Sequence, residues 1–494
     1  MANYILAIDQ GTTGSTALVV DEQLRVVAEA SEDFEQYFPQ PGWVEHDADQ
    51  IWASVISTVK KATASIDAKK IGAIGITNQR ETVCFWEKKT TRALSRSIVW
   101  QDRRTAADCD DLKKRGLEPV FSRSTGLLLD PYFSGTKVAW ALRNWGDVKS
   151  AHMNNRLCVG TIDSFLVARM TEGASHVTEP SNASRTLGFH IEKHEWDKEL
   201  NEALGLPTSI WPEVRPSTSR FGVTKNFAGL PDGIPISGIL GDQQAALLGQ
   251  ACIQEGTAKC TYGTGAFILV NTGDRIVPSQ HRLLSTIAWA LSEKDYTYAI
   301  EGSAFIAGAA VQWLRDGLGL IQSASEIEAL AATVVDNGGV GFVPALTGMG
   351  APYWEPGATG LLTGLTRGTT RGHIARAVLE GIALQIADLF SAMQKDANRP
   401  ISRVNVDGGA AANALLMQFQ SDILGVKLYR PKNLESTCLG AVFAAGLGVG
   451  IWNNLSEVAK SWQCDRVFEP QMSGEQREHA MRGWRKSVSR ALLK

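Results

Sequence analysis

Two short hairpins, each with a Gly/Thr turn, constrain this chain more than any other feature. The stretches "AIDQGTTGSTALVV" (7–20) and "TAKCTYGTGAFILVNTG" (257–273) both place such a turn between two apolar runs. Apolar runs bounded by turn residues are typical of antiparallel strands. The hairpins open the two halves of a chain of 494 residues, which is too long for one ordinary hydrophobic core. The sequence therefore predicts two related domains that face one cleft.

The first half alternates strands with helices. Residues 4–30 predict a meander of three antiparallel strands. Residues 48–66 have helical spacing, and Asp47 or Asp49 could cap that helix. Residues 71–88 predict a buried strand, a polar loop and a second strand. Strands that alternate with helices in this way predict an α/β fold.

The second half repeats the design of the first. Its hairpin is followed by a long helix at 373–395 and then by a strand, a Gly-Gly turn and a helix at 404–425. We therefore predict an N-terminal domain over 1–249 and a C-terminal domain over 250–494.

Two uncharged apolar stretches, 302–314 and 438–452, stand out in the second half. Both are too short to cross a membrane, so they predict buried helices. Their small residues would let another helix or a ligand approach closely.

Charge and cysteine content exclude several classes of protein. The net charge is −3 and no long basic stretch occurs, so we expect no nucleic-acid partner. The seven cysteines are scattered and form no CxxC pair, which argues against a disulfide framework or a zinc site. The first residues lack the basic and apolar regions of a signal peptide. We expect a cytoplasmic protein without membrane insertion.

The first Gly/Thr turn could bind phosphate. Its residues 11–15 combine backbone N–H groups with hydroxyls, and Asp9 ends the preceding apolar run where a carboxylate can hold a phosphate-bound Mg²⁺. The alternative is an ordinary hairpin that binds nothing. A Walker A loop is excluded, because no GxxxxGK[ST] motif occurs and the turn leads into a strand. The second turn, at 261–265, could clamp the same phosphates or be an ordinary hairpin as well.

Asp242 lies between an apolar strand and an apolar helix in "GILGDQQAALLG" (238–249). It could be a helix N-cap, or a general base at a strand end that faces the cleft. The residue pattern favours neither interpretation over the other.

Two further motifs have a structural and a functional interpretation. In "TNQRE" (77–81), Arg80 and Glu81 form either a surface ion pair of little energetic weight or a donor–acceptor pair that holds a polyol. In "VDGGAAANALL" (406–416), the glycines would let a flat ring or a sugar approach the backbone, although a Gly-Gly turn alone is weak evidence.

Taken together, these motifs resemble the FGGY family of carbohydrate kinases, from Ile5 to Trp484. The resemblance implies two ribonuclease-H-like domains of the actin and hexokinase type around a central cleft. It also implies ATP-dependent phosphorylation of a terminal hydroxyl of glycerol, which gives sn-glycerol 3-phosphate in glycerol uptake and catabolism. A kinase for a related tetritol or pentitol is the nearest alternative. An actin-like or chaperone-like ATPase is the alternative from another class. The landmarks are "DQGTTGS", "QPGWVEHD", "GITNQRET", "DPYFSGTK", "SNASRT", "GDQQAALLGQ", "YGTGAF" and "DGGAAAN".

The resemblance also implies roles for individual residues. Asp242 matches the catalytic base, Asp9 and Asp242 match residues near Mg²⁺, and the expected partners are glycerol and ATP or ADP in a homodimer or homotetramer. The residues matched to the polyol are Arg80, Glu81, Trp100, Tyr132, Asp242, Gln243 and Phe267, with Trp100 and Phe267 as apolar walls. The residues matched to the nucleotide are Thr12, Thr13, Gly14, Thr264, Gly308, Gln312, Gly409 and Asn413.

The sequence departs from the family pattern at two places. Thr16 occupies a position where relatives more often carry an arginine that approaches the nucleotide phosphates, and it cannot supply that charge. Some bacterial members bind fructose 1,6-bisphosphate through a basic loop. Here that loop, 227–238, carries Asp232 and Gly233 instead. We therefore predict weak or absent inhibition by fructose 1,6-bisphosphate.

Overall fold

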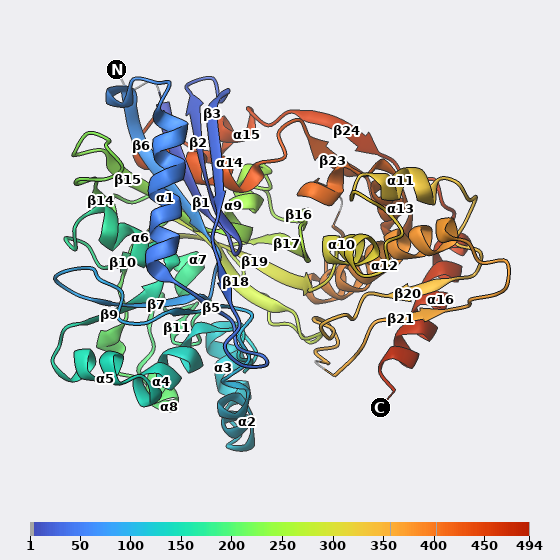
Figure 1. Ribbon diagram of the computed structural model, residues 1–494, viewed down its shortest axis with the longest axis horizontal. Coiled ribbons are helices and arrows are strands. Elements are labelled where there is room, and N and C mark those ends of the chain that lie inside the picture. Colours follow the sequence, from blue (N-terminus) through green and yellow to red (C-terminus); the bar gives the residue numbers. More distant parts are fainter. Residues whose placement is uncertain (1–3, 356, 402, 494) are drawn as a thin grey trace.

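Each half of the chain is built on a large mixed sheet, as the computed structural model in Figure 1 shows. The model describes residues 4–355, 357–401 and 403–493. The first sheet has, in spatial order, β14 (Gly222–Val223), β15 (Pro235–Gly241), β6 (Ile71–Asn78), β1 (Tyr4–Gln10), β2 (Gly14–Asp21) and β3 (Val26–Asp33). The second has β18 (Leu284–Ser292), β19 (Asp295–Ala304), β17 (Ala266–Gly273), β16 (Thr257–Tyr262), β22 (Arg403–Asp407), β23 (Leu428–Pro431) and β24 (Cys464–Phe468).

The two sheets share one topology. In the first, β1 and β3 run antiparallel to β2, while β6 and β15 continue the sheet parallel to β1. In the second, β16 and β19 run antiparallel to β17, while β22 and β23 continue parallel to β16. One difference is β18, which follows β17 in the chain but lies at the edge outside β19. Another lies at the opposite edge, where β14 precedes β15 in the chain but β24 follows β23. The predicted α/β fold with two related halves is confirmed, and so is the meander at the start of the chain.

Both predicted hairpins are present. The last strand pairs before the turns are Gln10 with Ser15 and Tyr262 with Ala266. The first turn is closed by a hydrogen bond from the Gly11 N–H to the Gly14 carbonyl at 2.9 Å. The second turn is tied to the segment after β19, because the Gly308 N–H donates to the Gly263 carbonyl at 2.9 Å.

The helix α1 (Ala48–Thr63) covers β2 and β3 (Figure 1). The Asp47 carboxylate accepts hydrogen bonds from the N–H groups of Asp49 at 2.8 Å and Gln50 at 3.2 Å. Asp47 is therefore the N-cap, which confirms one of the two residues that the sequence suggested. The helix buries an apolar stripe that includes Ile51 and Val55.

The helix α14 (Ser436–Gly448) belongs to the second half by sequence but packs on the first sheet. It contacts β1, β6 and β15 and crosses α9 (Asp242–Gly249). A Cβ atom added at Gly440 would lie 1.9 Å from the Ala245 carbonyl oxygen, and one at Gly249 would lie 1.9 Å from the Ser436 carbonyl oxygen. Only glycine permits so close a crossing. The predicted buried helix with small residues at 438–452 is confirmed as far as Gly448, and residues 449–452 lie outside the helix.

The apolar stretch 302–314 is only partly helical, so that prediction is half wrong. Its first residues end β19, where Ala304 pairs with Ala266, and the helix α10 begins at Gly308 and ends at Asp316. A short apolar run does not distinguish a buried strand from a buried helix by periodicity alone.

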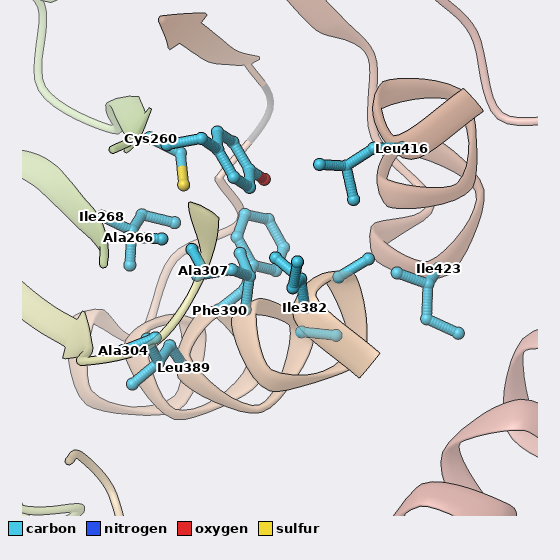
Figure 2. Packing of buried hydrophobic residues seen from close by; sticks show 14 of the residues in the cluster. Cys260, Ala266, Ile268, Ala304, Ala307, Ile382, Leu389, Phe390, Leu416 and Ile423 are labelled. Atoms are coloured by element: carbon cyan, nitrogen blue, oxygen red, sulfur yellow. The ribbon is translucent and has the colours of Figure 1, made fainter. Parts of the chain in front are cut away.

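The core of the second half lies between its sheet and the helices α12 (Arg371–Ala397) and α13 (Ala414–Leu424). Figure 2 shows Cys260 and Ile268 from the sheet in one cluster with Phe390 of α12 and Leu416 of α13. This core supports the second Gly/Thr turn from behind. The long helix predicted at 373–395 is confirmed within two residues at each end.

Smaller elements complete the chain. A five-stranded sheet has the order β4 (Gln36–Tyr37), β5 (Glu45–His46), β8 (Ser97–Ile98), β7 (Val83–Glu87) and β9 (Leu157–Thr161). Three strand pairs are β10 (Val177–Thr178) with β13 (Glu213–Val214), β11 (Phe189–His190) with β12 (Glu195–Trp196), and β20 (Gly341–Val343) with β21 (Leu361–Thr363). The other α-helices are α2 (Ala106–Lys114), α3 (Glu118–Thr125), α4 (Ser134–Asn144), α5 (Gly146–Met153), α6 (Ile162–Met170), α7 (Pro180–Ala183), α8 (Lys198–Leu204), α11 (Glu326–Ala331), α15 (Leu455–Ala459) and α16 (Gly474–Ala491). Among the described residues, every helix is too short or too polar to span a bilayer.

Candidate active site

A cavity of about 400 Å³ lies between the two halves, beside both Gly/Thr turns. It gathers residues from loops and strand ends that are far apart in the sequence. All seven residues matched to the polyol line it, together with three of those matched to the nucleotide. These are Arg80, Glu81, Trp100, Tyr132, Asp242, Gln243 and Phe267, with Thr12, Thr13 and Thr264.

A second cavity, of about 440 Å³, adjoins the first at the second Gly/Thr turn. Gly263 and Thr264 line both cavities. The wall of the second is largely apolar, and a flat ring would fit such a wall. Four further residues matched to the nucleotide line it, namely Gly308, Gln312, Gly409 and Asn413.

Two predicted site residues, Asp9 and Gly14, lie outside both linings. Gly14 begins β2, and a Cβ atom there would lie 2.8 Å from the backbone oxygen of Glu32 in β3. The close approach of β3 therefore explains why position 14 is a glycine. Asp9 is partly buried near the end of β1, and its burial together with the carboxylates of Asp242 and Glu435 raises its pKa to about 8. Their predicted contacts with nucleotide and metal stay predictions.

Arg80 is buried at the floor of the first cavity and joins the two halves. Its Nη1 donates to Glu301 Oε2 at 2.5 Å and its Nη2 to Glu301 Oε1 at 3.0 Å. The Nη1 also donates to Gln244 Oε1 at 3.1 Å. Its Nε lies 3.1 Å from Asp242 Oδ1. Burial alone would lower the pKa of Arg80, but the carboxylates of Glu301 and Glu81 raise it well above its ordinary value. The sequence-based alternative of an exposed surface ion pair is therefore wrong.

A second buried arginine, Arg185, completes this cluster. Its Nε donates to Glu81 Oε1 at 2.6 Å and its Nη2 to Glu301 Oε1 at 3.0 Å. Burial alone would raise the pKa of Glu301, but Arg185 and Arg80 lower it to about 2. Two guanidinium groups of the first half thus enclose one carboxylate of the second half.

Glu81 occupies a backbone conformation that is unusual for glutamate. Its φ of 62° lies in the left-handed region, in the loop between β6 and β7. Ser134 Oγ donates to its carbonyl oxygen at 3.1 Å, and Arg185 holds its carboxylate. Non-glycine residues in this region cost of order 1–3 kcal/mol and cluster at functional sites. Burial raises the pKa of Glu81, and the charges of Arg185 and Arg80 oppose that rise.

Asp242 is not the N-cap of α9, because Gly241 holds that position and no side chain caps the helix, so that interpretation is wrong and the role of general base stays a prediction. It is the first residue of α9, and its Oδ1 accepts a hydrogen bond from the Gln243 N–H at 2.7 Å. Its side chain also remains 30% exposed, in the cavity wall. A carboxylate held at a helix start and open to the cavity can accept a proton from a bound hydroxyl.

The aromatic wall of the first cavity is tied to the first Gly/Thr turn. Trp100 Nε1 donates to Thr12 Oγ1 at 2.9 Å, and the Trp100 and Tyr132 rings meet edge to face at 5.5 Å between centroids. Phe267 lines the cavity from the second half. The apolar walls expected at Trp100 and Phe267 therefore face one space.

Sequence reasoning missed several residues of the site. Glu301 and Arg185 gave no local signal, although Arg185 lies in the landmark "SNASRT". Lys259 was missed as well, and the structure buries it next to Gln243. Additional lining residues are Gln36, Phe38, Gln101, Thr261 and Phe305.

The donor set fits a magnesium ion that phosphate also holds. Asp9 and Asp242 are close enough for the second carboxylate to raise the pKa of the first, and a cation would relieve that repulsion. Within the described chain, no cluster of three or more Asp, Glu, His or Cys side chains could hold a metal ion by itself. Mg²⁺ commonly uses one or two carboxylates and completes its shell with water and phosphate oxygens.

The chain belongs to the FGGY family of carbohydrate kinases. The pattern of the family's N-terminal domain matches residues 4–249, and that of its C-terminal domain matches residues 258–449. The resemblance inferred from the motifs is thereby confirmed, together with the actin- and hexokinase-like fold.

Similar proteins include several named glycerol kinase. The glycerol kinase of Bdellovibrio bacteriovorus is 51% identical over 492 residues, and that of Myxococcus xanthus is 52% identical over 493, each covering 99% of both chains. The crystal structure of Plasmodium falciparum glycerol kinase with ADP matches with a TM-score of 0.93 and 36% identity, over 100% of this chain and 99% of that one. Gluconate kinase from Lactobacillus acidophilus shares the fold, with a TM-score of 0.87 at 24% identity over 98% of this chain and 97% of that one.

Proposed function

We propose that this protein is a glycerol kinase, which transfers the γ-phosphoryl group of ATP to a terminal hydroxyl of glycerol and releases sn-glycerol 3-phosphate and ADP. The observation that carries the proposal is the pair of adjoining cavities. One is small, with polar groups and aromatic walls around Asp242, and the other has an apolar wall. They meet at Thr264, where a phosphate chain would pass from one to the other. The relatives named glycerol kinase, about half identical over nearly the whole chain, support the same conclusion.

The polar residues of the first cavity would bind and orient the polyol. Glu81, Tyr132 and Gln243 supply acceptors and donors for its hydroxyls, and Trp100 and Phe267 cover its carbon atoms. Among the described residues, Arg80 donates three of its five N–H groups to Glu301 and Gln244, and the N–H groups that remain on Nε and Nη2 would be free to donate to the polyol next to Asp242.

Phosphoryl transfer asks the protein mainly for alignment and for stabilisation of charge. Asp242 would accept the proton of the attacking hydroxyl as the new bond to phosphorus forms. Backbone N–H groups and hydroxyls of the turns at 11–14 and 263–265 would bind the phosphate oxygens. Closure of the halves around the ligands would exclude water, which would otherwise compete as the acceptor.

Mg²⁺ would be held by Asp9 and Asp242 together with the phosphates. When bound, it would neutralise negative charge on the phosphate oxygens. Burial beside Asp242 and Glu435 favours a cation near Asp9, since that carboxyl group is otherwise hard to ionise.

The test is a kinetic panel of polyols with ATP and Mg²⁺. We expect ADP to form fastest with glycerol, and higher kcat/KM with a tetritol or pentitol would identify the nearest alternative instead. Hydrolysis of ATP that does not depend on any polyol would favour an actin-like or chaperone-like ATPase. In that case Trp100, Tyr132 and Phe267 would have no ligand to contact.

Family membership also supports proposals on location, oligomeric state and domain boundary. We infer a cytoplasmic homodimer or homotetramer with a domain boundary near Gly249. Light scattering on the purified protein would measure the oligomeric state, and limited proteolysis would locate the boundary.

A further inference from the structure

Lys259 is a buried lysine beside the first cavity, and the proposed mechanism gives it no part. It lies on β16, and its side chain is fully buried. Neighbouring residues of a strand point to opposite faces. Cys260 points into the core formed with α12 and α13 (Figure 2), so Lys259 points the other way, toward α9 and the cavity.

Both hydrogen-bond partners of Lys259 line the cavity. Its Nζ donates to Gln243 Oε1 and to Thr261 Oγ1, the latter at 3.0 Å. An ammonium group has three donors and no acceptor, so it can bind only the oxygen of the Gln243 amide. The amide NH₂ group of Gln243 must then point away from Lys259.

Burial and nearby carboxylates act on the charge of Lys259 in opposite directions, and the net effect is a pKa below its ordinary value. Burial lowers the pKa of Lys259, and the carboxylates of Asp407 and Asp242 oppose that effect. Asp407 is 2% exposed, and within the described part of the chain neither of its carboxylate oxygens has a hydrogen-bond partner. The ammonium therefore has a buried negative charge nearby to balance it.

We propose that Lys259 is a positioning residue that fixes the Gln243 amide with its NH₂ group toward the cavity, next to the carboxylate of Asp242. A hydroxyl bound there meets one donor and one acceptor side by side. It can accept from Gln243 while it donates to Asp242, which sets the direction in which its proton leaves. Without Lys259, the amide could rotate and present its oxygen instead, and two acceptors would then face one hydroxyl.

This inference rests on the proposed kinase activity, and a double-mutant cycle tests it. The variants are Lys259→Met, Gln243→Ala and the pair together, with kcat and KM measured for glycerol. If wild type prefers another polyol, the cycle is run with that polyol. The role of Lys259 can then be tested even if glycerol is not the preferred substrate.

We expect each single variant to lower kcat/KM by about tenfold, the loss of one hydrogen bond. Because Lys259 acts through Gln243, the double variant should fall within about threefold of Gln243→Ala alone. If the two losses instead multiply to about a hundredfold, Lys259 does not act through Gln243 and the proposal is overturned.

Two further variants separate positioning from support of the fold. Cys260→Ala, on the opposite face of the same strand, should lower the melting temperature and leave kcat/KM unchanged. Gln243→Glu keeps an acceptor for Lys259 but has no NH₂ group, so it should lose as much kcat/KM as Gln243→Ala while remaining folded. Wild-type kcat/KM in Gln243→Glu would overturn the proposal even if Lys259→Met cannot be purified.

Discussion

Arg80 and Glu301 form a two-pronged ion pair between the halves of the protein, with N–O distances of 2.5 and 3.0 Å and with both side chains buried. One comes from the loop after β6 and the other from β19. Arg185 binds the same carboxylate at 3.0 Å. The floor of the cleft is therefore a fixed, charged junction, and the groups that line the cavity are positioned from it.

Removal of the Glu301 charge should destabilise the protein strongly. Glu301→Gln leaves two buried guanidinium groups without their shared anion, and we expect a loss of about 3–5 kcal/mol in the free energy of unfolding. Denaturant unfolding measures this loss. Glu202→Gln is the matched control, because the Lys198–Glu202 pair is exposed and should contribute under about 1 kcal/mol. Similar losses of unfolding free energy in Glu301→Gln and Glu202→Gln would contradict a stabilising role for the buried Glu301 carboxylate.

The same pair predicts a pH dependence. The folded state lowers the pKa of Glu301 from 4.5 to about 2. A carboxyl group with a depressed pKa stabilises the fold fully above its unfolded pKa, and this stabilisation is lost as the pH falls toward 2. Between pH 4.5 and 2, the unfolding free energy of wild type should therefore fall more steeply than that of Glu301→Gln.

Replacement of the proposed base should slow catalysis strongly without abolishing polyol binding. Asp242→Asn keeps the size of the side chain but cannot take a proton, so we expect kcat to fall by on the order of 10²-fold or more. Steady-state kinetics and calorimetric titration with glycerol measure the two properties separately. A near-normal kcat would remove Asp242 from this role.

The crossing of α9 and α14 should tolerate no side chain at Gly440. A Cβ atom there would lie 1.9 Å from the backbone oxygen of Ala245, so α14 and α9 must move apart, and Asp242 begins α9. We expect Gly440→Ala to lose about 1–3 kcal/mol of stability and to lower kcat/KM. Gly483→Ala, in α16 with nothing within 4 Å of the added carbon, should instead stabilise by about 0.5–1 kcal/mol. Unfolding and kinetic measurements on both variants check the contrast.

His46 should make the fold less stable in mild acid. Burial lowers its pKa from 6.5 to about 4, while Nε2 contacts Gln36 Oε1 at 2.6 Å. As the pH falls from 6.5 to 4, the unfolded chain takes up a proton that the folded chain refuses, so stability decreases over that range. Urea unfolding at several pH values should show a shallower decrease in His46→Asn. Parallel curves would show that His46 does not cause the effect.

Fructose 1,6-bisphosphate should inhibit weakly or not at all. In the loop at 227–238, the Asp232 carboxylate accepts a hydrogen bond from the Asn226 N–H at 2.8 Å, and the nearby Lys225 pairs with Glu172 at 2.9 Å. This arrangement offers an anion a negative charge and an already neutralised lysine. Rates measured with and without the bisphosphate test the expectation, and strong inhibition would refute it.

Local patterns predicted the elements whose causes are local. Both hairpins, the Asp47 cap and the buried helix at 438–448 follow from turn residues, capping chemistry and small residues within one segment. The helix predicted at 302–314 was half wrong, because residues 302–304 are strand through their pairing with β17.

Site residues that belong to a sequence motif could be predicted. Site residues that come together only through contacts between distant segments could not. The family motifs gave all seven polyol residues around one cavity. Glu301 has no motif, and its role appears only when β19 meets the loop after β6. Gly14 resembled a phosphate contact, but the structure gives its lack of a side chain another reason, the close approach of β3.

The position of α14 has a consequence for synthesis on the ribosome. Residues such as Ile5 and Ala7 of the first sheet share a buried cluster with Ala441 and Ala445. Chains emerge from the N-terminus onward, so the sheet made from the first 241 residues must wait for residues 436–448 before that apolar face is covered. In the nascent chain, this apolar face therefore stays exposed until most of the protein has been synthesised.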